Sequence, residues 1–568
     1  MFQGFIRGVS GPKKNACYFA SAVCAWALIV ITANAQTQVT INQNQTYQRM
    51  AGFGASLTDS AGAALATLNP TARENLMRAL FDPAAGAGLS FLRQPMGVSD
   101  FRRADYTYND TLGDYAMTQF NINGDLALYP NSNVSLVSLL QSAQSHNPAL
   151  RIMGSPWTAP GWMKAGTAGN IVPQPGVNQT LYAGTLNNNS QTIPAYANYF
   201  AKYVQAYAAQ GLQIDYVTPQ NEPYFNGGFA YPAMTLTPTQ QGNLIRAIGQ
   251  NFATATVNPA LPHDPVTNPY LSQTTRIVMH DHNWSDAVTG NAPSTNITAI
   301  LNNPAIAQYV HGVAFHGYGG DVSAQTIVHN AYPDKATFFT EQTGTVGSNF
   351  GNDLMYDMRT LVVGGTRNWA SSIVKFNLAL DQTSGPKIRT ITFDNGGGNT
   401  VTADSGFNRA RGVVTINSIT GAITFNEEYY ALGHIAKFVQ PDAVRIDTNA
   451  NKTVAFLNPD QTLALIAYND AGQSQIFRFN WKGRFFTYQL PPQSAVTFRW
   501  QENLLSSPVE VYQTTGNRAD LLARKANVRF IPEPGIWAWG LAILVMLAGY
   551  ICHKQQFVLK FDGLGFIT

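Results

Sequence analysis

The chain has 568 residues, of which 45% are hydrophobic and only 12% charged, and its formal net charge is +3. This length exceeds one ordinary compact domain and suits a barrel of roughly 250–400 residues with at least one further domain. The low charge and the lack of Lys/Arg runs argue against nucleic acid as a partner, whereas the many Asn, Gln, Thr, Ser and Tyr residues suit a neutral, hydroxyl-rich ligand.

The N-terminal segment 1–35 is expected to be a signal peptide. Basic residues at positions 7, 13 and 14 precede an apolar run from 16 to 31. Ala33-Asn34-Ala35 then fits the small-x-small cleavage rule, which places the mature start near Gln36. The alternative is an N-terminal membrane anchor that stays attached.

Cysteine usage limits the chemistry of the folded part. Cys17 and Cys24 lie in the expected signal peptide, and Cys552 lies in an apolar C-terminal stretch. Between them we expect no disulfide, no thiolate metal site and no cysteine nucleophile.

Residues 36–50 are expected to form N-terminal strands, and from Gly52 to about Asp381 strand-like and helix-like stretches alternate. Helical patterns cover 193–209 and 237–252. Alternation of this kind predicts βαβ units around a parallel sheet, an α/β class. The apolar, strand-like runs lie at 89–93, 151–154, 215–220, 276–280, 312–316 and 336–340.

The C-terminal third has a different pattern. Residues 385–412 are rich in Gly, Asn and Thr and indicate a loop or insertion. Strand-like runs separated by short turns fill 412–501, which predicts an antiparallel β-sandwich. We interpret 502–531 as a polar linker.

A C-terminal sorting or membrane-anchoring segment is expected at 532–568. Pro-Glu-Pro at 532–534 precedes an apolar run over 535–552, followed by His553 and Lys554. About 18 apolar residues can just span a bilayer, so one interpretation is a membrane anchor. The same order resembles the bacterial sorting tail named after that tripeptide, which implies processing by a sorting protease. The basic cluster here is weak, and the choice between anchor and sorting tail stays open.

Two glutamates follow strand-like runs. Glu222 stands in Asn221-Glu222-Pro223 and Glu341 in Thr340-Glu341-Gln342, 119 residues later. A gap of about three βα units would place them on strands 4 and 7, facing each other across a barrel mouth. Glycoside hydrolysis needs such a pair, one carboxyl to protonate the leaving oxygen and one to attack the anomeric carbon. Either glutamate alone could be an ordinary loop carboxylate.

Further candidates follow other strands. Arg93 could position a nucleophile, Asp100 could accept sugar hydroxyls, and Trp157 could stack on a sugar face. His316 could contact the substrate and Tyr318 the nucleophile. The structural alternatives are a buried ion pair, aromatic loop packing and a core histidine.

Taken in order, these motifs resemble glycoside hydrolase family 30, the glucosylceramidase-like family. The collinear match runs from Gly52-Phe-Gly-Ala-Ser-Leu-Thr-Asp through the motifs at 93–100, 155–157, 220–223 and 340–341 to Asn377-Leu-Ala-Leu-Asp and the strands up to Trp500. The resemblance implies a (β/α)8 TIM barrel, here over 51–411, with a side β-sandwich to which the first mature strands contribute.

The resemblance also implies residue roles and retention of anomeric configuration. Glu222 matches the acid/base and Glu341 the nucleophile, and no metal or cofactor is expected. Some family members have Trp where Gly317 stands, and Trp is frequent at the position of Phe376, so these two departures are expected to reshape the binding subsite. The substrate-binding positions of the family match Arg93, Asp100, Trp157, Asn221, His316 and Tyr318.

We therefore expect a retaining β-glycosidase of the glucosylceramidase type, acting on a β-linked glucoside or glucan. Endo-β-1,6-glucanase, or another β-glycanase of the family, is the alternative. Remoter possibilities are a non-catalytic carbohydrate-binding protein and a structural protein of the cell surface. We expect burial and the charge of Glu341 to raise the pKa of Glu222. The expected location is outside the cell or at the surface of a Gram-negative bacterium.

Overall fold

The computed structural model describes residues 36–516 except 168–170, 173, 228–229, 395–398 and 502–508, and also 524–525 and 531–532. The expected signal peptide and the apolar stretch 535–552 lie outside these residues, so export, anchoring and sorting stay predictions. Within the described residues, no helix has both the length and the apolar character that crossing a membrane requires.

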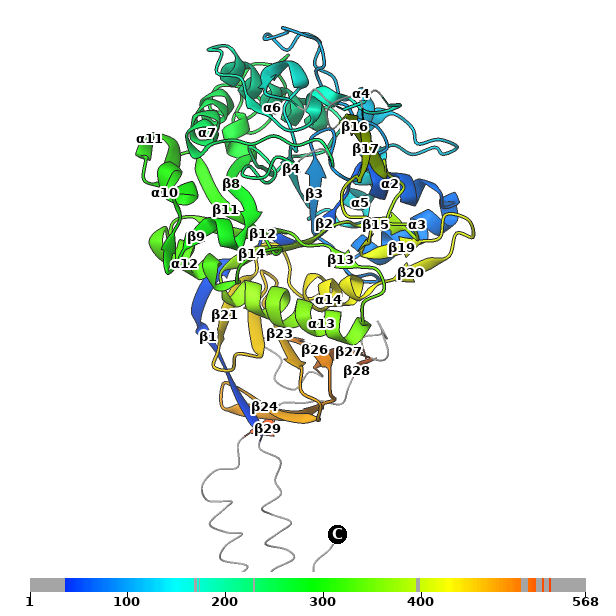
Figure 1. Ribbon diagram of the computed structural model, residues 1–568. Coiled ribbons are helices and arrows are strands. Elements are labelled where there is room, and N and C mark those ends of the chain that lie inside the picture. Colours follow the sequence, from blue (N-terminus) through cyan, green and yellow to red (C-terminus); the bar gives the residue numbers. More distant parts are fainter. Residues whose placement is uncertain are drawn as a thin grey trace, which may run out of the picture.

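Eight parallel strands form a closed barrel and follow one another around the ring in chain order (Figure 1). The six predicted runs all become barrel strands, whereas β2 and β14 were not predicted. This confirms the barrel expected from the family resemblance. The strands are β2 (Gly52–Ser56), β3 (Phe91–Pro95), β4 (Arg151–Ser155), β7 (Tyr216–Val217), β8 (Arg276–Asn283), β11 (Val310–His316), β12 (Ala336–Glu341) and β14 (Ala370–Lys375).

Helices surround the barrel, and their ends follow local sequence signals. Thr237 caps α7 through the Gln240 backbone N–H, Gln240 bonds back, and Pro238 occupies the first turn. The larger outer helices are α3 (Pro70–Phe81), α5 (Leu136–His146), α6 (Thr192–Ala208), α7 (Pro238–Phe252), α10 (Thr295–Leu301), α12 (Ser323–Ala331), α13 (Phe350–Tyr356), the π-helix η3 (Asp357–Gly365) and α14 (Glu427–Ala436).

Shorter elements lie in the connections. They are α2 (Asp59–Ala66), α4 (Asn123–Leu126), α8 (Leu271–Thr274), α9 (Trp284–Ala287), α11 (Pro304–Ala307), η1 (Gly161–Met163), η2 (Gln179–Leu181), β5 (Lys164–Ala165), β6 (Thr185–Leu186), β9 (Val288–Thr289), β10 (Ala292–Pro293), β13 (Gly344–Thr345), β15 (Ala379–Asp381) and β18 (Ala410–Arg411).

The barrel interior changes from apolar to polar along the strands. One cluster of buried apolar side chains fills its middle, namely Phe91, Met153, Tyr216, Val278, Ala314, Phe338 and Val374. Side chains of a strand alternate between its two faces, so the residue two positions later points inward again. On five of these seven strands the later residue is polar and buried and belongs to the floor of the barrel mouth: Arg93, Ser155, Thr218, His316 and Thr340.

The second domain is one ten-stranded sheet that folds back on itself. Phe479 of β24 lies 5.1 Å, ring to ring, from Phe498 of β26, which closes a sandwich core. The first described strand, β1 (Thr37–Arg49), lies between β21 and β24, as expected for 36–50. The remaining strands are β21 (Val444–Thr448), β22 (Thr453–Leu457), β23 (Thr462–Asn469), β24 (Gln475–Trp481), β25 (Arg484–Leu490), β26 (Ser494–Gln501), β27 (Glu510–Thr515), β28 (Arg524–Lys525) and β29 (Ile531–Pro532).

Two expected boundaries of this domain were wrong. The strand-like run after 412 does not join the sandwich: it forms β19 (Val414–Ile416), which pairs with β15 and with β20 (Ile423–Phe425) beside the barrel. Helix α14 then separates these strands from the sandwich, which begins at Val444. The expected linker 502–531 contributes β27, which pairs with β26. Its neighbouring residues Val511 and Tyr512 are buried on opposite faces of the strand, Val511 in the sandwich core and Tyr512 against His434 of α14.

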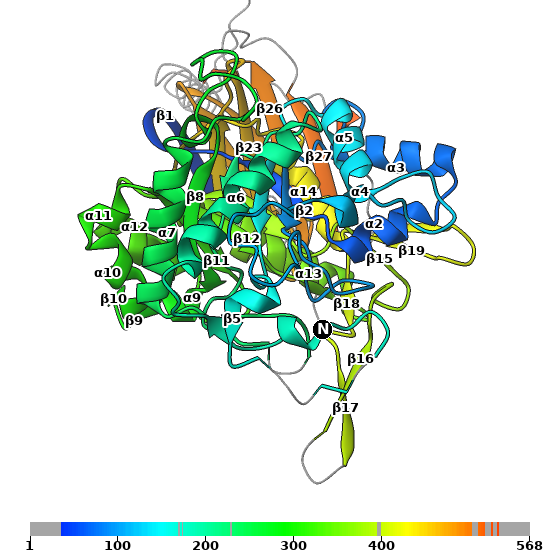
Figure 2. The same ribbon diagram turned by 90° about the horizontal axis from the view of Figure 1, so that it is seen from above.

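An antiparallel hairpin projects from the barrel on the side of the polar floor. It comprises β16 (Thr390–Asp394) and β17 (Thr400–Asp404), within the stretch expected as a loop or insertion. Figure 2 shows it as a narrow two-stranded arm. Its base is anchored, since Ile391 is fully buried in a cluster with Ile171 and Tyr182.

Candidate active site

The two predicted glutamates meet at the barrel mouth. Glu222 follows β7, the fourth strand, and Glu341 ends β12, the seventh. One carboxylate oxygen of each lies within 4.8 Å of the other. This is close to the separation of about 5–5.5 Å typical of retaining glycosidases and shorter than the roughly 6.5–9.5 Å of inverting ones. Both side chains line a cavity of about 690 Å³.

Arg93 holds the floor of the site together. Its guanidinium is fully buried and donates to Glu341 Oε2 at 2.6 Å, to Asn221 Oδ1 at 2.6 Å and to Asp281 Oδ2 at 2.8 Å. Charge-assisted bonds of this length are strong and directional. Arg93 therefore fixes one oxygen of Glu341 and the side chain of Asn221.

Asp281 was missed by the sequence analysis, although it comes directly after the predicted strand 276–280. It is fully buried and accepts from Arg93, from the hydroxyls of Ser155, Thr218 and Thr340 at 2.7–2.8 Å, and from His316 Nε2 at 3.2 Å. These contacts hold the pKa of Asp281 well below its usual range, against the effect of burial. The rule that selected Glu222 and Glu341, a carboxylate at a strand end, would also have found it.

His316 links the floor to the reactive carboxylates. Its Nδ1 lies 3.1 Å from Glu222 Oε1 and its Nε2 lies 3.2 Å from Asp281 Oδ1. Burial alone would lower the pKa of His316, but the charge of Glu341 and the bonds to Asp281 and Glu222 raise it to about 9. Both ring nitrogens thus face carboxylates, as in an imidazolium that donates twice.

The charged His316 side chain reverses the expected direction of the Glu222 pKa shift. Burial tends to raise the pKa of Glu222, but the His316 hydrogen bond and charge outweigh it, and the pKa of Glu222 is lowered. The pKa of Glu341 is raised by burial and by the charge of Glu222, although His316 and Arg93 oppose this. In the free site, the proton needed by a general acid is therefore on His316, one hydrogen bond away from Glu222.

Tyr318 and Asp100 complete the polar walls of the cavity. The Tyr318 hydroxyl donates to Glu341 Oε1 at 3.0 Å, so both oxygens of Glu341 have a donor. Asp100 lines the cavity, and its buried Oδ1 has no hydrogen-bond partner within the described part of the chain. Burial and the charge of Glu341 raise the pKa of Asp100 to about 7, while Lys387 opposes the rise. An unpaired buried oxygen suits a carboxylate that receives a ligand hydroxyl.

Trp157 was expected to stack on a sugar face, but its ring does not line the cavity. Only 2% of its surface is exposed, and it packs with Phe101 and Phe376 rather than lining the cavity. The Arg93 guanidinium lies 4.8 Å from its ring centroid, and the Phe376 ring stacks on it at 6.0 Å. Trp157 thus supports Arg93 from below through a cation–π contact.

Glu222, His316 and Glu341 form the one histidine–carboxylate cluster with metal-ligand spacing among the described residues. Their existing contacts do not suit a cation. Arg93 and Tyr318 already donate to the two oxygens of Glu341. A histidine protonated on both nitrogens has no lone pair to offer a metal.

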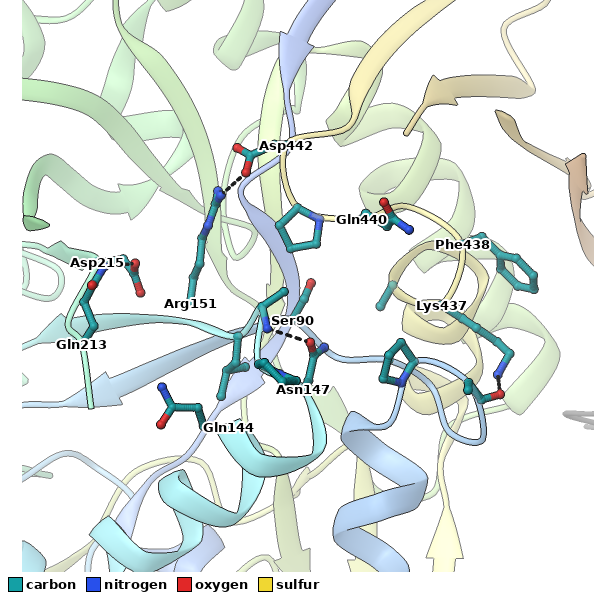
Figure 3. A pocket seen from close by; sticks show the side chains of 18 of the residues that line it. Ser90, Gln144, Asn147, Arg151, Gln213, Asp215, Lys437, Phe438, Gln440 and Asp442 are labelled. Carbon is teal, nitrogen blue, oxygen red and sulfur yellow. Dashed lines mark hydrogen bonds and ion pairs between the residues drawn. The ribbon is translucent and has the colours of Figure 1, made fainter. Parts of the chain in front are cut away.

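A larger cavity, about 850 Å³, lies at the opposite end of the barrel, where β3, β4 and β7 begin (Figure 3). The charged groups that line it already have polar partners. Arg151 forms a 2.6 Å ion pair with Asp442, and Lys437 Nζ donates to the Ala84 carbonyl at 2.8 Å. This face joins the barrel to the sandwich, and in TIM barrels the chemistry is placed at the other face.

Comparison with known proteins agrees with this geometry. The sequence matches the Glycosyl hydrolase family 30 TIM-barrel domain over residues 50–439 and the Glycosyl hydrolase family 30 beta sandwich domain over residues 442–498. The chain belongs to glycoside hydrolase family 30. It is therefore a glycosidase, and the two family domains divide where the structure places the end of α14 and the start of the sandwich.

The proteins similar to this chain include two glucanases and a putative glucosylceramidase. The endo-1,6-beta-D-glucanase neg1 of Aspergillus fumigatus is 30% identical, over 79% of this chain and 85% of the relative. The solved structure of the endo-beta1,6-glucanase BT3312 has a TM-score of 0.68 and 29% identity, and the similarity covers 83% of this chain and 96% of that one. The putative glucosylceramidase 4 of Caenorhabditis elegans is 27% identical, over 77% of this chain and 78% of the relative.

Proposed function

We propose that the protein is an endo-β-1,6-glucanase that hydrolyses its substrate with retention of anomeric configuration. The short distance between the Glu222 and Glu341 carboxylates is the observation that carries the retaining mechanism. Support for the substrate comes from the relatives named above, in which the glucanases are more similar to this chain than the glucosylceramidase. The comparisons thus favour the alternative of the sequence analysis over its preferred glucosylceramidase-type activity.

In the first step, a Glu341 oxygen attacks the anomeric carbon while the bond from that carbon to the leaving oxygen breaks. Glu222 gives its proton to the leaving oxygen, so the departing sugar is neutral. The Arg93 and Tyr318 hydrogen bonds orient Glu341 for attack. The product is a glycosyl ester on Glu341 and an ionised Glu222.

Before this step, a proton must move from His316 to Glu222 across their 3.1 Å contact. The transfer leaves the net charge of the pair unchanged, since an ion pair becomes a neutral pair. A bound sugar displaces water from the cavity, and desolvation favours the neutral pair. We therefore infer that substrate binding moves this proton onto Glu222.

In the second step, Glu222 removes a proton from water, and the water oxygen attacks the anomeric carbon. The ester bond to Glu341 breaks, which restores both side chains. Two inversions leave the product with the configuration of the substrate.

The decisive assay follows sugar release from linear β-1,6-glucan and from glucosylceramide, with NMR detection of the anomer formed first. We expect the β-anomer to be released first from glucan. Glu222→Gln and Glu341→Gln should each lower kcat by a factor of about 10⁴ or more, as is seen when an essential nucleophile or acid is removed from an enzyme. Glu74→Gln, on the outer helix α3, is the matched control. Release of the α-anomer first would exclude retention, and activity on glucosylceramide alone would restore our original preference.

A further inference from the structure

The most exposed aromatic side chains of the described residues are gathered in one region. Phe225 and Tyr318 each have 46% of their surface exposed, and Phe407 has 44%. Exposing large apolar groups to water is unfavourable, so a concentration of them on one face marks a binding surface.

All three surround the mouth of the active-site cavity. Tyr318 and Phe407 line it directly. Phe225 stands three residues after Glu222, with its backbone N–H bonded to the Glu222 carbonyl at 3.0 Å. Its ring lies 6.2 Å from that of Tyr231, which lines the cavity.

The three rings come from different connections around the barrel. Phe225 follows the fourth strand, Tyr318 the sixth and Phe407 the eighth. Phe407 follows its strand only after β15, β16 and β17, and its neighbour Gly406 packs against Asp100 in the loop after the second strand. Phe225 and Phe407 therefore approach the cavity from different sides.

Phe407 is held in place by its surroundings. It follows the base of the β16–β17 arm, which is pinned to a neighbouring loop by the bond from Val172 N–H to the Thr392 carbonyl at 3.0 Å. Next to it, Lys387 Nζ donates to the Ser405 carbonyl at 2.7 Å. The backbone that carries Phe407 is thus held in place, which limits the freedom lost when its ring binds a ligand.

We propose that Phe225 and Phe407 are stacking subsites for glucosyl rings on the two sides of the bond that is cleaved. Phe225 serves the leaving-group side, because the proton donor Glu222 in the same turn must face the leaving oxygen. Phe407 serves the opposite side. β-Glucosyl rings present C–H faces that pack against aromatic rings. The ligand of these subsites is a β-glucan chain of at least three units, and this inference rests on the proposed function.

The test compares substrates of different length. β-Glucosyl fluoride fills only the reaction site, whereas β-1,6-linked gluco-oligosaccharides of two to six units also reach the aromatic rings. We expect kcat/KM of the unaltered protein to rise with length. Phe225→Ala and Phe407→Ala should each lower kcat/KM on the six-unit substrate about 10-fold or more, as expected for a stacking contact. The decrease in kcat/KM on β-glucosyl fluoride should be smaller in both variants.

Two further variants sharpen the result. Phe225→Trp and Phe407→Trp keep a stacking face and should retain the dependence on length, and Leu261→Ala, an exposed apolar residue on the α7–α8 connection, is the control. Alanine variants that process the six-unit substrate as fast as the unaltered protein would overturn the stacking role while leaving the proposed function intact. If the unaltered protein cleaves β-glucosyl fluoride but no β-1,6-linked oligosaccharide, the proposed function fails and the inference fails with it.

Discussion

Asp281 and His316 meet at 3.2 Å in the buried floor beneath the two glutamates. The same carboxylate forms a 2.8 Å ion pair with Arg93, which in turn binds Glu341. Asp281 therefore connects to both reactive carboxylates without touching either. One connection runs through His316 to Glu222 and the other through Arg93 to Glu341.

This connection predicts that Asp281→Asn changes the pH profile of the reaction. Without the Asp281 charge, the pKa of His316 should fall below about 9, so the alkaline limb of kcat against pH should move to lower pH. Breaking a buried ion pair should also lower the free energy of unfolding by on the order of 3 kcal/mol. Asp357→Asn is the control, since its buried 2.8 Å pair with Lys375 contacts neither Glu222 nor Glu341. A similar loss of stability with an unchanged pH profile is expected there.

Stability itself should depend on pH through His316. Its folded pKa of about 9 exceeds the unfolded value of about 6.5, so the folded state binds more protons between these values. The His316 contribution is then fully present below pH 6.5 and disappears as pH rises through 9. Urea unfolding at pH 6 and pH 9.5 should show the decrease, and His316→Gln should flatten it. An equally steep decrease in His316→Gln would assign the effect to other groups.

Asp100 and Lys387 should determine the pH below which KM begins to rise. Asp100 accepts hydrogen bonds from sugar hydroxyls more strongly when it is ionised, and its pKa of about 7 therefore predicts a rising KM below pH 7. Lys387 opposes that raised pKa, so Lys387→Met should move the rise in KM to higher pH. Initial rates between pH 5 and pH 8 measure the shift. Lys482→Met, exposed in the sandwich, should leave the profile unchanged.

The segment first interpreted as a linker should contribute to stability. Tyr512 of β27 is fully buried, and its ring lies 4.4 Å from that of His434 in α14. A chain that ends at 501 should therefore melt at a lower temperature than one that ends at 516. Tyr512→Ala in the full chain should cost about 3–5 kcal/mol, as for other buried aromatic truncations. Equal melting temperatures for the two chain ends would show that β27 is dispensable.

Much of the fold was predictable because its signals are local. Apolar runs that end in polar residues predicted six barrel strands, and the spacing of Glu222 and Glu341 predicted strands 4 and 7. Strand β2 was missed since Gly52, Gly54 and alanine give a weak strand pattern. The close approach of β2 to β3 explains why residue 54 is glycine: a Cβ on Gly54 would lie 1.9 Å from the Phe91 carbonyl oxygen.

The exposure and the pKa values of the site residues were less predictable, because they depend on burial and on contacts between distant segments. Sequence identifies Trp157 as an aromatic residue in a loop, but only the packing of Phe101 and Phe376 shows that its ring is covered. Likewise, two carboxylates suggest mutual repulsion, and the pKa of Glu222 depends instead on a histidine 94 residues away. Such three-dimensional contacts leave no trace in the spacing of motifs.

The position of β1 has a consequence for how the molecule reaches its native state. Thr37 pairs with Phe477, and Ile41 pairs with both Trp481 and Thr448, so the sheet joins segments more than 400 residues apart. Closing so long a loop is slow, because the chain loses conformational entropy before the stabilising contacts form. A fragment beginning at 442 would lack the central strand between β21 and β24 and would expose two unpaired edges that invite aggregation. The sandwich is thus not a separable module: it can be completed only after nearly the whole chain has been synthesised.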